Sequence, residues 1–286
     1  MGEERWVRRP VVAGMFYEGD ARSLRRQLER CFTGKGGPGE IPKAVETPAE
    51  KTTGLVSPHA GYEYSGACAA HGYAAAAGRG RFDCVVMVGP NHSGMGAAVA
   101  VYPGDGFATP LGVVPADKDL GRTIAAACPE AELDEWAHSR EHSLEVQLPF
   151  LQFIWGDQVP AVAAVAMSDQ RACTATSLGK AIAESVNGLN ALLVASTDLS
   201  HFHRQQQAET LDKACLEPVL QMDGPALVRL VEGRGISMCG YGPVAAVLTA
   251  AKALGLGQAQ LLHYTNSGEV TGDRQRVVGY ASVLVR

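Results

Sequence analysis

The stretch that decides the fold reads SPHAGYEYSG and runs from Ser57 to Gly66. An apolar segment, residues 54–56, precedes it, and an alanine-rich pattern follows from about residue 67 to 77, so it predicts a strand end, a polar turn and a helix start. This arrangement puts His59 at the end of a strand. Ligands bind beyond the carboxyl ends of strands in open α/β sheets, so His59 is a candidate site residue. The residue types alone leave open whether it binds a ligand or caps the turn.

Two other apolar runs end in the same way. Residues 83–90 form a continuous apolar run bounded by Gly-Pro, which is typical of a strand buried on both faces, and His92 follows it. Residues 191–195 form a second such run and lead into a segment that contains Asp198 and His201. Titratable groups are therefore expected at the ends of several buried strands.

Strand and helix patterns alternate along the whole chain. Further strands are expected at 97–102, 111–114, 159–167, 260–264 and 277–285, and helices at 22–31, 117–128, 174–186, 207–221, 225–232 and 244–254. Asp20 and Asp117 are candidate N-caps. This alternation predicts one α/β domain over residues 1–286, with a mixed, mostly parallel central sheet flanked by helices. Residues 33–52, rich in Gly, Pro, Lys and Glu, are expected to form a surface loop.

Composition excludes several classes of function. The chain has 286 residues and a formal charge of −5, without a basic stripe, which argues against binding to nucleic acid. No apolar run is long enough to cross a bilayer, so no membrane association is expected. The seven cysteines are scattered and odd in number, which favours a reducing compartment. We therefore expect a cytoplasmic protein, in which most cysteines are small buried residues.

The candidate site residues are of types that bind transition metals. His59, His92 and His201 follow strands, and Cys239 stands at the start of a helix. Imidazole and thiolate ligands suit iron, copper or zinc when rigid elements hold them. The spacing fits no short metal-binding motif, so only the fold could bring these groups together. A buried apolar role for Cys239, and a turn-capping role for Asp198, are the structural alternatives.

Six ordered sequence blocks resemble those of the Memo family, from about residue 8 to the C-terminus. They are Ala13 to Tyr17, Pro58 to Gly66, Gly89 to His92, Glu141 to Pro149, Ser196 to His201 and Cys239-Gly240. The resemblance implies a fold similar to class III extradiol dioxygenases, which are iron enzymes that open catechol rings. It also implies that prokaryotic relatives often occur with a companion radical-SAM protein.

The resemblance further implies roles for individual residues. His59, His92 and Cys239 match metal ligands, while Asp198 and His201 match residues that line the same pocket. Fe(II) is the expected metal, with copper or zinc as alternatives. His201 is the candidate base for a catechol proton, oriented by Asp198. A further histidine, His142, belongs to a matching block with no clear role, and Tyr62 is either a pocket wall or a packing residue.

These features favour two functions of different classes. The first is a non-haem, Fe(II)-dependent dioxygenase-type or related redox enzyme that acts on a small aromatic, catechol-like compound. The alternative is a non-catalytic protein that binds copper or iron, or a protein or peptide partner, on the dioxygenase scaffold. Asp198 and His201 support the first, because a metal holder needs no base. Cys239 supports the second, since the dioxygenases have a carboxylate there. A zinc hydrolase is a third possibility.

Overall fold

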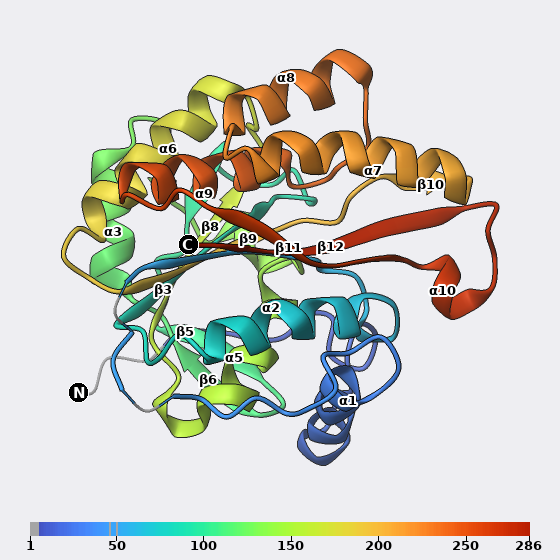
Figure 1. Cartoon of the computed structure of the whole chain (residues 1–286). Coiled ribbons are helices and arrows are strands. Elements are labelled where there is room, and N and C mark those ends of the chain that lie inside the picture. The colour runs from blue at the N-terminus through green and yellow to red at the C-terminus, as the bar shows by residue number, and fades with distance from the viewer. Residues whose placement is uncertain (1–5, 46, 50) are drawn as a thin grey trace.

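A mixed β-sheet forms the middle layer of the protein, and helices cover both of its faces (Figure 1). The computed structural model describes residues 6–45, 47–49 and 51–286. Within them the large sheet has nine strands, in the order β10-β12-β2-β9-β3-β8-β4-β7, with β11 also paired to β12. The predicted α/β fold, with a mixed central sheet flanked by helices, is confirmed.

Four parallel strands make the centre of this sheet. They are β2 (Thr53–Ser57), β9 (Ala191–Ser196), β3 (Cys84–Pro90) and β8 (Val162–Met167), and every residue in them is buried. Side chains alternate between the faces: in β3, Val85 and Met87 pack into one apolar core and Val86 and Val88 into the other. Burial on both faces explains why these strands are continuous apolar runs in the sequence.

The carboxyl ends of these strands bring the candidate residues together. His59, His92 and Asp198 each stand two positions beyond the last residue of β2, β3 and β9, respectively. Because the three strands are parallel and adjacent, all three residues emerge at one edge of the sheet. The fold therefore supplies the convergence that the sequence spacing did not.

Two helical layers enclose the sheet (Figure 1). Their members pack against different apolar cores on the two faces. One layer contains α3 (Lys118–Ala127), α6 (Ala172–Ser185), α7 (Gln205–Leu220), α8 (Gly224–Arg234) and α9 (Tyr241–Ala253). The other contains α1 (Ala21–Thr33), α2 (Ala67–Ala77) and α5 (Leu148–Trp155). Asp20 and Asp117 cap α1 and α3 as predicted, since their carboxylates accept the N–H groups of Ser23 and Leu120.

The remaining elements are short or lie at the margins of the sheet. The outer strands are β4 (Val99–Val101), β7 (Ala131–Leu133), β10 (His201–His203), β11 (Ala259–Asn266) and β12 (Val277–Val285). A separate sheet joins β1 (Val7–Arg8), β5 (Gly106–Thr109) and β6 (Gly112–Pro115). The short helical turns are η1 (Tyr62–Gly66), α4 (Trp136–Ser139), η2 (Glu145–Gln147), η3 (Gly156–Gln158) and α10 (Gly268–Thr271). The short strands β4 and β6 overlap predicted strands, whereas β1, β5, β7 and β10 were not predicted, because strands of two to four residues carry little pattern.

The other sequence expectations fare as follows. The described residues between α1 and β2 form neither helix nor strand, as expected of a loop. Five of the seven cysteines are buried, but Cys173 is exposed on α6 and Cys239 is half-buried, so the expectation of burial was wrong for Cys173. Among the described helices, none has the length and apolar character that a bilayer crossing requires.

Glycine allows α2 to lie directly on the sheet. A Cβ at Gly72 would lie 2.3 Å from Leu55 Cδ1 and 2.4 Å from Ser282 Oγ, both of them buried side chains of β2 and β12. The helix therefore depends on the absence of a side chain at this position.

We expect Gly72→Ala to lower the free energy of unfolding by about 1–3 kcal/mol, because overpacking outweighs the gain in helix propensity. Urea denaturation followed by circular dichroism measures the change. Gly78→Ala at the end of the same helix is the control, since a Cβ there meets its nearest atom at 3.6 Å. Equal stability of the two variants would contradict the close packing of α2.

Candidate metal centre

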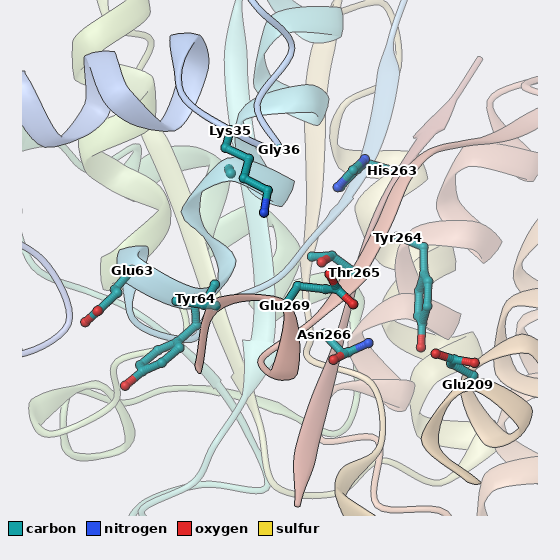
Figure 2. A pocket seen from close by; sticks show the side chains of 12 residues that line it. Lys35, Gly36, Glu63, Tyr64, Glu209, His263, Tyr264, Thr265, Asn266 and Glu269 are labelled. Carbon is teal, nitrogen blue, oxygen red and sulfur yellow. The ribbon is translucent and has the colours of Figure 1, made fainter. Parts of the chain in front are cut away.

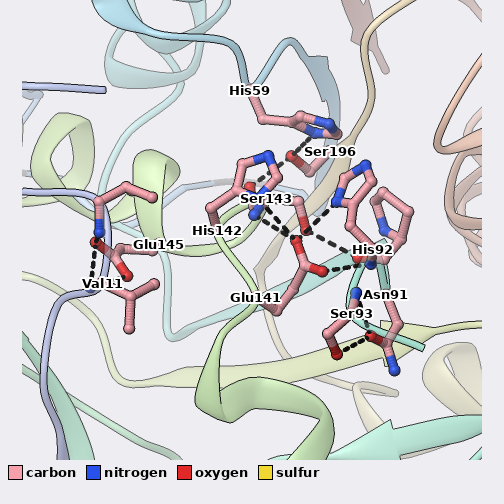
Figure 3. A network of polar contacts seen from close by, with 12 residues as sticks. Val11, His59, Asn91, His92, Ser93, Glu141, His142, Ser143, Glu145 and Ser196 are labelled. Atoms are coloured by element: carbon pink, nitrogen blue, oxygen red, sulfur yellow. Dashed lines mark hydrogen bonds and ion pairs between the residues drawn. The ribbon is translucent and has the colours of Figure 1, made fainter. Parts of the chain in front are cut away.

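Three histidines converge at the carboxyl edge of the sheet (Figure 3). His59, His92 and His142 each offer one ring nitrogen, and these three atoms lie within 4.8 Å of one another. His59 is buried, while the side chains of His92 and His142 keep 35% and 23% of their surface exposed. The cluster is thus rooted in the core and reaches solvent on one side, as a site for a small molecule requires.

Hydrogen bonds fix the tautomer of His59. Its Nδ1 lies 2.9 Å from Ser196 Oγ, and that hydroxyl donates its own hydrogen to the Ser143 carbonyl oxygen at 2.7 Å. Ser196 Oγ can therefore only accept from His59, so Nδ1 carries the proton. The lone pair of His59 is then on Nε2, the ring nitrogen that can bind a metal.

A buried carboxylate does the same for His92. His92 Nδ1 lies 2.9 Å from Glu141 Oε1, and the His92 backbone N–H donates to Glu141 Oε2 at 2.5 Å. Burial by itself would raise the pKa of Glu141, but the His92 side chain and the Ser143 N–H lower it to about 2. Glu141 is therefore ionised and accepts the Nδ1 proton, leaving Nε2 of His92 as the metal-binding atom. Carboxylate–histidine pairs of this kind orient ligands in many metal sites.

His142 is held differently from the other two. Its Nδ1 is 3.6 Å from Glu141 Oε1, which is too long for a hydrogen bond. Its ring stacks on His92 with centroids 4.7 Å apart and meets the edge of Phe16 at 4.9 Å. Packing and backbone position, rather than a side-chain hydrogen bond, determine where this ring lies.

The surroundings keep the imidazoles in the form that binds metals. Burial, followed by the charges of His92 and His142, lowers the pKa of His59 well below its usual value. Burial also lowers the pKa of His142, against the opposing charge of Glu141. Both rings are therefore neutral near pH 7, and metals bind only neutral imidazole. The donor set thus fits a transition metal.

Cys239 lies beside this cluster, one residue before the N-cap of α9. Its Sγ is 3.1 Å from His59 Nε2 and accepts the N–H of Asp198 at 3.1 Å. Burial, and next the charge of Asp198, raise the pKa of the thiol, so without a cation the sulfur is protonated. Two predicted ligands, His59 and His92, are thus brought together with His142, and Cys239 is placed against His59.

The two predicted acid–base residues are separately anchored. Asp198 Oδ1 accepts the backbone N–H of His59 at 2.8 Å, and burial raises the pKa of this carboxyl to about 6. The Nδ1 of His201 lies 2.7 Å from the Ser237 carbonyl oxygen, so Nδ1 donates and Nε2 is left as the acceptor. The His201 ring is therefore oriented by Ser237 instead of the expected Asp198. It still lies close enough for its charge to affect the pKa of both His59 and Asp198.

Tyr62 is a packing residue. Only 4% of its surface is exposed, its ring packs against Tyr17 and Phe150, and its hydroxyl donates to the Val146 carbonyl oxygen at 2.6 Å. These contacts match the second of the two roles expected for Tyr62, that of a packing residue.

A cavity of about 710 Å³ lies elsewhere, along β11 (Figure 2). Its lining includes Lys35, Tyr64, His263 and Glu269 and contains none of the three clustered histidines. The histidine cluster is therefore not part of this cavity.

Sequence reasoning missed the residues that support the histidines. Glu141 was quoted only as part of a block, and Gln147 and Ser196 were given no role, although Gln147 Nε2 donates to Ser196 Oγ at 2.9 Å. The available signal was a carboxylate directly before a histidine, Glu141-His142. That signal is weak, because such pairs are common on exposed loops.

Fold and cluster together define an α/β protein with a candidate metal centre at the carboxyl edge of its sheet. The family model described as Memo-like protein matches residues 8–284, and the chain belongs to the Memo family. A MEMO1 family protein of Methanopyrus kandleri is 41% identical over 282 residues, covering 98% of this chain and 99% of the relative. One of Methanothermobacter thermautotrophicus is 40% identical over 277 residues, covering 96% and 99%.

A solved structure shares the fold at low sequence identity. The crystal structure of an uncharacterized protein from Escherichia coli K12 superposes with a TM-score of 0.56 and 13% identity, covering 82% of this chain and 99% of that one. This likeness supports the α/β architecture and carries nothing about activity.

Glu141→Gln tests whether the buried carboxylate organises the centre. We expect the affinity for Co(II) or Zn(II) to fall about 10- to 100-fold, because His92 loses the anion that fixes its tautomer. Competition with a chromophoric chelator measures the affinity. Glu135→Gln, at an exposed position six residues away, is the control. Equal affinities for Glu141→Gln and the unmodified protein would rule out this role.

Proposed function

We propose that this Memo-family protein is a non-haem metalloprotein with Fe(II) at the histidine cluster. In this proposal it acts as a dioxygenase-type or related redox enzyme on a small aromatic, catechol-like compound. The observation that carries it is the convergence of three imidazole nitrogens within 4.8 Å. Copper and zinc are the alternative occupants, since all three metals accept imidazole.

The chain's own residues suggest how the metal would be held. His59 and His92 would each bind through Nε2, the nitrogen that carries the lone pair when Nδ1 donates its proton to Ser196 or Glu141. His142 or Cys239 would supply the third donor: His142 offers a ring nitrogen within 4.8 Å of those of His59 and His92, and Cys239 Sγ lies 3.1 Å from His59 Nε2. When bound, Fe(II) would supply the redox chemistry that activates dioxygen toward an aromatic ring.

Proton transfer would fall to His201. Because its Nδ1–H is held by the Ser237 carbonyl, its Nε2 is a fixed proton acceptor. A catechol must lose a proton to become a good ligand, and an imidazole nitrogen held in a fixed orientation can accept that proton. Asp198 would act indirectly. Its carboxylate accepts the backbone N–H of His59, and it interacts electrostatically with His201.

A second function is favoured by one specific observation, the thiol of Cys239 at 3.1 Å from His59 Nε2. A thiolate is a soft ligand that prefers copper or zinc, and it is itself oxidised by strong oxidants. A protein that binds copper or iron without ring opening, with or without a protein or peptide partner, is the alternative that this residue supports.

Metal content in single variants tests the site. Anaerobically purified His92→Ala should retain less than about a tenth of the metal of the unmodified protein, since one of three ligands is lost. Elemental analysis of His142→Ala and Cys239→Ala identifies the third donor, because only the variant that removes it should lose metal. His203→Ala and Cys173→Ala are matched controls outside the cluster. Full metal content in all three cluster variants would remove the proposed site.

Oxygen uptake separates the enzyme from the metal holder. With Fe(II) loaded anaerobically, we expect oxygen consumption with at least one member of a catechol panel. In His201→Gln the rate should fall about 10²- to 10⁴-fold at unchanged iron content, because the proton acceptor is lost and no ligand is removed. Full iron occupancy with no oxygen consumption on any catechol would favour the non-catalytic alternative.

A further inference from the structure

Arg8, far from the cluster in sequence, is buried against the segment that carries His142. Only 7% of its surface is exposed. Its Nε donates to the His138 carbonyl oxygen and its Nη2 to the Glu141 carbonyl oxygen, both at 2.5 Å. The planar guanidinium thus fixes the backbone at Glu141, the residue immediately before His142. Only arginine can bind two carbonyls and a carboxylate in this fixed fork.

The carboxylate partner of Arg8 is Glu145, which follows His142 by three residues in the sequence. Glu145 Oε2 is 2.7 Å from Arg8 Nη1, and neither side chain exposes more than 6% of its surface. Glu145 also accepts the N–H groups of Val11 and Val12 and the hydroxyl of Tyr17, at 2.7–3.0 Å. These bonds fasten the N-terminal segment over the same stretch of chain (Figure 3).

That N-terminal segment places Phe16 against His142. In the sequence, Phe16 lies between Val12 and Tyr17, which both donate hydrogen bonds to Glu145. Its ring meets the His142 ring edge-on, with centroids 4.9 Å apart. The Arg8–Glu145 pair therefore acts on the position of His142 in two ways. Arg8 fixes the backbone that leads into His142, and Glu145 fixes the segment whose aromatic ring packs on the imidazole.

His142 has particular need of such support. The Nδ1–H groups of His59 and His92 donate to Ser196 and Glu141, and these hydrogen bonds orient both rings. By contrast, the Nδ1 of His142 lies 3.6 Å from Glu141 Oε1, too far for a hydrogen bond. Within the described residues no side-chain hydrogen bond fixes this ring. We propose that the buried Arg8–Glu145 pair is the positioning device that keeps His142 in the metal cluster. This inference rests on the proposed metal site.

The test is a double-mutant cycle read out as Co(II) affinity. The proteins are the full-length chain, Arg8→Gln, His142→Ala and the double variant, each titrated anaerobically with Co(II) and followed by its visible absorption. Each single substitution should weaken Co(II) binding about tenfold, as loss of a supporting contact or ligand does. If Arg8 acts through His142, the double variant should bind within about twofold of His142→Ala. The absorption bands of Arg8→Gln should resemble those of His142→Ala.

Two further variants keep the outcome interpretable. Arg122→Gln removes an arginine from an exposed ion pair with Asp119 and should leave Co(II) binding unchanged. Phe16→Leu removes only the aromatic ring that packs on His142. Its effect on Co(II) affinity should likewise not add to that of His142→Ala. It decides the question if Arg8→Gln does not fold.

Distinct results separate failure of this inference from failure of the proposed site. Unchanged Co(II) affinity in Arg8→Gln and Phe16→Leu would overturn the positioning role. Losses that add to that of His142→Ala, with Co(II) spectra like that of the unmodified protein, would assign a purely structural role and also overturn it. No Co(II) binding by the unmodified chain would reject the metal site itself.

Discussion

The parallel alignment of four strands buried on both faces is the constraint from which the site follows. Within β2, β9, β3 and β8 every side chain is buried, so polar groups can first appear where the strands end. Parallel strands end at one edge, and their hydrogen-bonded register aligns those ends: Ser57 lies beside Ser196 in β2 and β9, and β3 continues the same ladder. His59, His92 and Asp198 consequently emerge side by side although 139 positions separate His59 from Asp198.

Ionic interactions then convert proximity into orientation. The carboxylate of Glu141 binds both the ring and the backbone N–H of His92, so it sets the tautomer and the position of one ligand together. A buried carboxylate without such donors would be protonated, because burial raises the pKa of an acid. The cost of burying this charge is offset by the hydrogen bonds that the site needs for orientation.

The sequence was informative where local rules apply and silent where distant parts of the chain meet. Continuous apolar runs followed by polar residues identified His59, His92 and Asp198, because strand burial leaves a local signature. The N-caps Asp20 and Asp117 were likewise readable from neighbouring residues. The position of His142 was not, since its segment contains only the short turns α4 and η2 and depends on Arg8 and Glu145, which are 137 positions apart. A pairing over that distance has no local pattern. Likewise, the carbonyl of Ser237 that orients His201 belongs to a segment 36 positions away.

The protonation of the groups around the histidine cluster determines how they would respond to a bound cation. Cys239 and Asp198 are neighbours. Burial, and next the charge of Asp198, raise the pKa of the thiol, while burial raises the pKa of Asp198 itself to about 6. Two neighbouring anions, one of them buried, would repel each other, so the chain without a cation keeps a proton on the sulfur. A divalent cation at His59 and His92 would reverse this preference, because it stabilises both anionic forms and displaces the thiol proton. The same groups that are poorly accommodated as anions in the protein alone become complementary to a metal. In the proposed site, this complementarity accounts for a buried carboxyl and a half-buried thiol beside His59, whose pKa burial lowers.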